Sequence, residues 1–136
     1  MLSLRTPAAA FALAFVLAAL LVSGCGSSNP SYCAKADDLE LAVQDLKEVN
    51  LSKGVSSLTS AVSKVQTTAD AAVTAAKKDF PTETGRIESS VTTLKTAVDT
   101  LPSSPSATQI ATLTVRIASV VDAVNGFVSQ TKKKCD

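Results

Sequence analysis

The stretch Ser106–Val128, SATQIATLTVRIASVVDAVNGFV, decides the fold of this chain. Its large apolar residues recur at alternating spacings of three and four, at Ile110, Leu113, Ile117, Val120, Val124 and Phe127. That period places them along one face of an α-helix. The opening Ser-Ala-Thr-Gln matches a capping box, in which the side chains of Ser106 and Gln109 each bond the other residue's backbone N–H. We therefore expect a long helix that starts at Ser106 and buries one stripe.

Three stripes with the same period precede it. They are Tyr32, Ala36, Leu39, Val43 and Leu46, then Val55, Leu58, Val62, Val65, Ala69, Ala72 and Ala76, and then Ile87, Val91, Leu94, Val98 and Leu101. Pro81 ends the second helical segment, Thr82 or Thr84 is the expected cap of the third, and residues 102–106 form a loop rich in Pro and Ser. Strict alternation of apolar and polar residues is missing. The sequence thus predicts an all-α fold, an antiparallel up-and-down four-helix bundle over residues 31–136.

The first 24 residues are set apart as a signal peptide. Arg5 lies in a short positive region, and the uncharged run from Ala8 to Val22 is shorter than the ~18–20 residues of a membrane-spanning helix. Val22-Ser23-Gly24-Cys25 resembles the lipobox of bacterial lipoproteins, with valine in place of the more usual leucine. The resemblance implies cleavage before Cys25 and attachment of lipid, including palmitate, to that residue. The alternatives are an ordinary secretory signal peptide and an uncleaved anchor.

A lipid on Cys25 would account for the odd cysteine count. The chain has three cysteines, so acylation of Cys25 leaves Cys33 and Cys135 as a pair in an oxidising compartment. We expect a disulfide between them; unpaired thiols and pairing between molecules are the alternatives. An even number of up-and-down helices brings both chain ends to one end of the bundle, whereas three helices of 20 residues would separate them by about 30 Å. Residues 25–30 are then a flexible lipidated tether.

Two features at the tether end of the bundle are candidate contact sites. Lys132, Lys133 and Lys134 would face anionic headgroups at the bilayer surface, or would simply complement the end of the helix dipole. Ala69, Ala72 and Ala76 leave room beside larger apolar residues. They form either large-against-small packing or an apolar pocket for a lipid-like ligand.

The composition excludes several classes of function. Residues 25–136 carry twelve basic and twelve acidic side chains, since Arg5 is one of the chain's thirteen Lys and Arg, so we expect no nucleic-acid partner. Histidine is absent, which disfavours general acid–base catalysis and a zinc site, and the residues suggest no cofactor or metal. The acidic residues Asp37, Asp38 and Glu40 are interpreted as a solvated first helical turn.

We therefore expect no enzymatic activity. The expected function is that of a lipid-anchored protein on the extracytoplasmic face of the cell membrane, whose helical bundle contacts a protein or the cell wall. The mature part resembles small uncharacterised lipoproteins of Gram-positive actinobacteria, a resemblance that implies no activity. The alternative function is a small carrier of apolar or lipid-like ligands.

Overall fold

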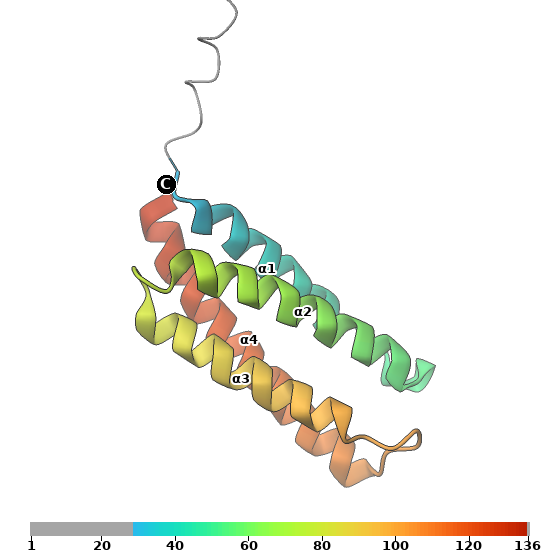
Figure 1. Cartoon of the computed structure of the whole chain (residues 1–136). Helices are drawn as coiled ribbons and strands as arrows, with labels where there is room; N and C mark the ends of the chain where they lie inside the picture. Colours follow the sequence, from blue (N-terminus) through green and yellow to red (C-terminus); the bar gives the residue numbers. More distant parts are fainter. Residues whose placement is uncertain (1–28, 136) are drawn as a thin grey trace, which may run out of the picture.

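The structure is a computed structural model, and it describes residues 29–135. Four α-helices make up this part of the chain: α1 (Ser31–Lys47), α2 (Val55–Ala76), α3 (Pro81–Asp99) and α4 (Ala107–Cys135). A 3-10 turn, η1 (Leu51–Lys53), lies between α1 and α2 (Figure 1). No β-strand occurs among the described residues. The predicted all-α class and the number of helices are confirmed.

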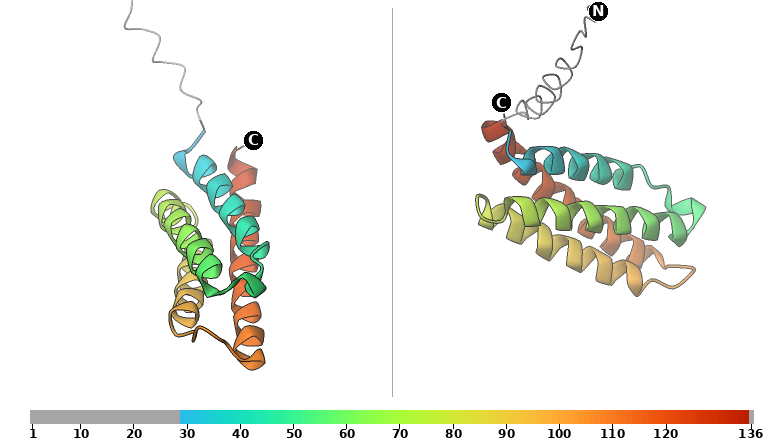
Figure 2. Two further views of the ribbon diagram at one scale, coloured as in Figure 1. Left: turned by 90° about the vertical axis from the view of Figure 1, so that its right-hand side faces the viewer. Right: turned by 45° about the horizontal axis from the view of Figure 1, so that its top comes forward.

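The helices pack as a closed ring. Each helix contacts the next one in the chain, and α1 also contacts α4, whereas the diagonal pairs α1–α3 and α2–α4 make no backbone contacts. The two further views show the four helices lying side by side, with the start of α1 next to the end of α4 (Figure 2). Each helix therefore has two neighbours and one outward face.

The core consists of the stripes expected from the sequence. Its largest fully buried side chains include Leu39 from α1, Leu58 from α2, Ile87 from α3, and Leu113 and Phe127 from α4. They belong to one continuous cluster that draws on every helix. Burial of apolar surface at about 25 cal/mol per Å² is the main force that holds such a bundle together.

A disulfide joins Cys33, in the first turn of α1, to Cys135, the last residue of α4. The two Cα atoms lie 5.9 Å apart, and 102 positions separate the cysteines in the sequence. The predicted pairing of Cys33 with Cys135 is confirmed. It closes the ring of helices between its first and last members.

Helix termini show where the local prediction was right and where it was wrong. The capping box is confirmed, because the Ser106 N–H donates to Gln109 Oε1 at 2.8 Å and the Gln109 N–H donates to Ser106 Oγ at 3.2 Å. The predicted cap of α3 was wrong: Pro81 is the first helical residue, and neither Thr82 nor Thr84 occupies the capping position. Proline suits that position because its missing N–H would have no partner there.

Thr84 has a different role from the predicted one. Its side chain is 1% exposed, and its hydroxyl donates to the carbonyl oxygen of Phe80 at 2.8 Å. A buried hydroxyl needs such a partner to offset the loss of water. At the other end, α3 stops at Asp99, so Leu101 lies in the following turn and only packs against the core.

Candidate functional site

A large groove runs between α3 and α4. It has a volume of about 750 Å³ and opens to solvent. Its polar side chains come from both helices, and they include Arg86, Ser89, Ser90 and Thr93 from α3 and Arg116 and Ser119 from α4. These positions flank the buried stripes that contain Ile87 and Leu113. The packing of α3 against α4 that buries those stripes therefore also places the two groove walls opposite each other.

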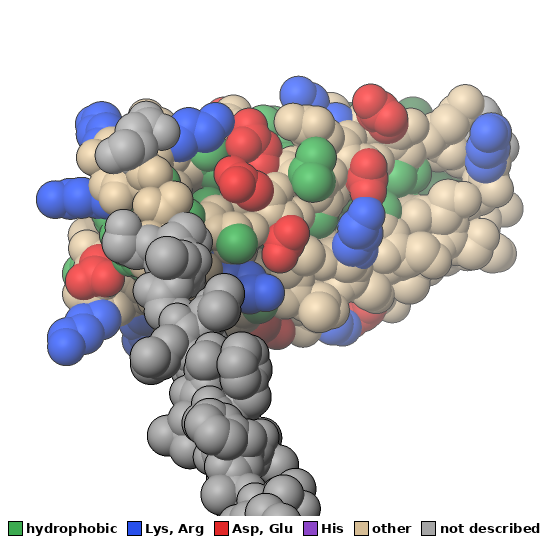
Figure 3. Space-filling view, turned by 90° about the horizontal axis from the view of Figure 1, so that it is seen from above, with side chains coloured by type: hydrophobic (Ala, Val, Ile, Leu, Met, Phe, Trp, Pro, Cys, Tyr) green, Lys and Arg blue, Asp and Glu red, His purple; other side chains and the backbone are tan. Residues whose placement is uncertain are grey.

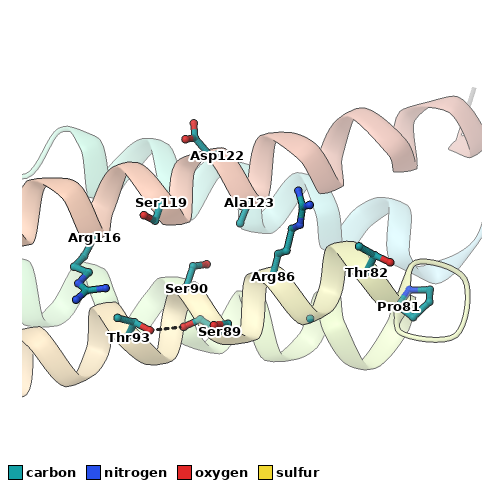
Figure 4. A pocket seen from close by; sticks show the side chains of 11 residues that line it. Pro81, Thr82, Arg86, Ser89, Ser90, Thr93, Arg116, Ser119, Asp122 and Ala123 are labelled. Atoms are coloured by element: carbon teal, nitrogen blue, oxygen red, sulfur yellow. Dashed lines mark hydrogen bonds between the residues drawn. The ribbon is translucent and has the colours of Figure 1, made fainter.

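Both arginines of residues 29–135 line this groove. In Figure 4, Arg86 extends from α3 toward α4, and Arg116 extends from α4 toward α3. Within the described part of the chain neither guanidinium forms an ion pair, whereas each of the four ion pairs there uses a lysine. Two guanidinium groups with free donors thus face the same groove. Guanidinium groups bind carboxylates and phosphates with two parallel hydrogen bonds.

Hydroxyl groups occupy the groove between the arginines. Ser90, Thr93 and Ser119 donate to carbonyl oxygens about one turn earlier in their own helices, at 3.1, 2.8 and 3.1 Å. Because those protons are already used, the hydroxyl oxygens offer lone pairs to the groove. Arginine donors at two points and the acceptor oxygens of these three hydroxyl groups between them are therefore available to a ligand.

A second groove lies on the other side of α3, against α2, with a volume of about 350 Å³. Its charged side chains are Asp70, Glu88, Lys95 and Asp99. Lys95 Nζ is bonded to the Asp99 carboxylate in the same helix. Carboxylates therefore predominate here, although no group of three or more acidic or sulfur ligands placed to hold a metal ion occurs among residues 29–135.

The predicted membrane-facing lysines are all exposed at the end of α4, next to the disulfide. Two of them have partners in the domain: Lys132 lies 3.5 Å from Glu40 of α1, and Lys133 donates to Gln130 at 3.3 Å. Figure 3 shows basic side chains at the end of the domain where α1 begins, with acidic ones interspersed along the same face. Cys25, the predicted lipid attachment site, lies outside the described residues.

The acidic cluster of α1 does not form a first helical turn, as the sequence analysis had suggested. Helix α1 begins at Ser31, and its first turn contains no acidic residue. Asp37 and Asp38 are exposed one turn further on, and Asp38 pairs with Lys35 at 3.7 Å. The helix starts earlier than the cluster because Pro30 precedes it directly and the Cys33 N–H bonds the Pro30 carbonyl.

The alanine residues predicted to leave space are themselves in the core. Ala69, Ala72 and Ala76 are 2%, 0% and 0% exposed. The same cluster contains Phe80 and Phe127, whose rings meet edge to face at a centroid distance of 6.1 Å. Small residues on α2 thus accompany the aromatic residues at this end, as expected of close packing.

Helix α4 is the one helix within residues 29–135 that is long and apolar enough to cross a membrane, judged by length and composition. In the structure this helix packs against α1 and α3 instead, and buries Val120, Val124 and Phe127. Val115, on the outward face of α4, is 64% exposed.

The groove arginines were not singled out by the sequence analysis. One available signal was that Arg86 and Arg116 are the only arginines among twelve basic side chains after residue 24. Their proximity, however, depends on the contact between α3 and α4. Comparison with models of protein families, with curated proteins and with solved structures finds no match to this chain.

Proposed function

We propose that this chain is a non-enzymatic lipoprotein of the bacterial cell envelope. In this proposal a lipid on Cys25 holds it at the extracytoplasmic face of the cell membrane, and its helical domain contacts a cell-wall or protein partner. The observation that supports the proposal best is the disulfide between Cys33 and Cys135. Disulfides persist in oxidising compartments, and this pair uses the two cysteines that remain when Cys25 carries lipid.

The proposal includes an antiparallel up-and-down course of the four helices. The contacts of each helix with its neighbours in the chain support it, as does the link between the first turn of α1 and the last turn of α4. With residues 25–30 as tether, the disulfide end of the bundle faces the bilayer. The α3–α4 groove then runs away from the membrane along the side of the domain.

Cell fractionation tests the anchor. We expect the full-length chain in the membrane fraction and its Cys25→Ser variant in the soluble extracytoplasmic fraction, with Ser27→Ala as a matched change that leaves membrane attachment intact. Mass spectrometry of the extracted protein should find lipid on an N-terminal Cys25. It should also find a mass two hydrogens below that of the dithiol form. A Cys25→Ser chain that stays in the membrane fraction would refute the lipid anchor.

The lysine cluster provides a weaker, separate contact with the bilayer. In the Cys25→Ser chain, Lys133→Ser with Lys134→Ser should reduce co-flotation with phosphatidylglycerol vesicles, since each lysine near an anionic surface contributes about 1 kcal/mol. Lys47→Ser with Lys53→Ser, two exposed lysines near η1 at the opposite end of the bundle, is the matched control. Equal flotation of the two double variants would remove the membrane contact from the proposal.

Crosslinking on whole cells tests the envelope partner. A crosslinker that reacts with amines should join the anchored chain to wall material or to an envelope protein, and this product should be lost when the chain is released by Cys25→Ser. The carrier hypothesis predicts instead that an apolar molecule co-purifies with the chain. Organic extraction followed by mass spectrometry distinguishes that outcome.

A further inference from the structure

We propose that the α3–α4 groove binds an anionic glycan or polyol chain, with two of its phosphate or carboxylate groups held by Arg86 and Arg116. The inference deepens the proposed function by giving the chemical class of its cell-wall partner. The observations behind it are the unpaired arginines, their separation along the groove and the hydroxyl groups between them.

The separation of the arginines favours an extended ligand. In Figure 4, Arg86 lies opposite Ala123, whereas Arg116 lies opposite Thr93. From residue 86 to residue 93 is about two helical turns, or roughly 10 Å along α3. A single small anion between the arginines would reach one of them, but a chain that carries repeated anionic groups reaches both.

The hydroxyl oxygens of Ser90, Thr93 and Ser119 favour a ligand that donates hydrogen bonds between its charges. Their own protons are directed to backbone carbonyls, so their lone pairs accept protons from the ligand. Sugar or polyol hydroxyl groups supply such protons on the same chain that carries the anionic groups. The groove thus offers guanidinium donors at two points and hydroxyl acceptors between them. A chain whose anionic groups are joined by hydroxyl-bearing units complements that arrangement.

One carboxylate belongs to the groove and limits its positive charge. Asp122 of α4 lines the rim, and in Figure 4 its side chain points away from α3 and from both guanidinium groups. It forms no ion pair with Arg86 or Arg116. Asp122→Asn should therefore strengthen anion binding modestly, by relief of long-range repulsion.

Isothermal titration calorimetry on the full-length chain in non-ionic detergent tests the proposal. The probes are a glycerol-phosphate oligomer, an oligogalacturonate, neutral dextran, poly-glutamate and inorganic phosphate. We expect binding of at least one of the first two, which differ in the anion they carry, and much weaker or no binding of the other three. Binding should weaken as salt is added, because exposed charges are screened.

Variants locate the binding. Arg86→Gln and Arg116→Gln should each weaken it about tenfold, and the double variant about a hundredfold, as expected when charge-assisted hydrogen bonds are lost. The matched control is Lys47→Gln with Lys53→Gln, which removes two exposed charges near η1, away from the groove. It should leave the affinity within a factor of two.

Four results would overturn the proposal. These are no binding of either anionic oligomer, unchanged affinity in the double arginine variant, an equal loss in the lysine control, and dextran, poly-glutamate or inorganic phosphate binding as tightly as the oligomers. None of them depends on membrane attachment, so failure here and failure of the lipid anchor are separate findings.

Discussion

The two grooves that flank α3 differ in charge although one helix forms a wall of both. On the side of α4, Arg86 and Arg116 have no ion pair among the described residues, and Ser and Thr oxygens lie between them. On the side of α2, carboxylates predominate and Lys95 is already bonded to Asp99. The core stripe of α3 is common to both sides. The difference shows that the residues beside a buried stripe, and not the stripe itself, determine the charge and hydrogen-bonding groups of each groove.

Removal of the disulfide should have the largest effect. Cys33→Ala with Cys135→Ala opens a loop of 102 positions, and the chain-entropy model gives about 4–5 kcal/mol of stability for a loop of that length. Urea unfolding of the variant and the parent measures the loss. Because the bond joins α1 to α4, folded variant molecules should keep both grooves of α3. Equal stability of variant and parent would contradict this prediction, as would loss of groove binding in molecules that remain folded.

Truncation of Ile87 should damage both grooves together. The residue is 0% exposed and lies on α3 between the two walls. Ile87→Ala should lower the free energy of unfolding by about 2–5 kcal/mol through lost burial and a residual cavity. Ile110→Ala, at a half-buried position on α4, is the control and should cost clearly less. If the two variants unfolded at the same urea concentration, the core would not be continuous through α3.

Substitution of two exposed helical glycines should distinguish effects on the stability of the fold from effects on ligand binding in the α3–α4 groove. An added Cβ meets nothing within 4 Å at Gly85, which lines the α3–α4 groove, or at Gly126 of α4, which is not among the residues lining it. Gly85→Ala and Gly126→Ala should each stabilise the fold by about 0.5–1 kcal/mol, since alanine is the better helix former. Only the methyl group added at position 85 should weaken binding of the anionic oligomer in the α3–α4 groove. Thermal unfolding and titration of both variants provide the two measurements, and equal binding would show that the ligand does not reach Gly85.

Loss of the Lys95–Asp99 ion pair should have the smallest effect. Both side chains are about half exposed, at 43% and 52%, so solvent screens the pair. Lys95→Ala should change the free energy of unfolding by less than about 0.5 kcal/mol, and the change should vanish in high salt. Binding in the α3–α4 groove should stay the same. A destabilisation above about 1 kcal/mol would contradict this prediction and would show that the ion pair stabilises the α2–α3 side of the bundle.

Much of the fold was predictable because it depends on local rules. Apolar spacing of three and four predicted the four helices, and Ser106 with Gln109 predicted the start of α4. Cysteine counting predicted the disulfide. The cap of α3 was not predictable in this way, because Thr84 is drawn into the core and bonds the Phe80 carbonyl instead.

The candidate groove, in contrast, could not be predicted from local rules. Arg86 and Arg116 are 30 positions apart, and each by itself is an ordinary exposed residue of an amphipathic helix. The partner of Lys132 was also unpredictable, since Glu40 belongs to α1 and only the packing of α1 against α4 brings them to 3.5 Å.

The sequence by itself thus determined the helices, their buried faces and the cysteine pair, because backbone periodicity and covalent chemistry act within a helix or between named atoms. Only the tertiary structure decided which polar residues meet across helices. The physical reason is that burial constrains the apolar stripe of each helix, whereas the polar positions beside it acquire neighbours from the rotation and register of packed helices.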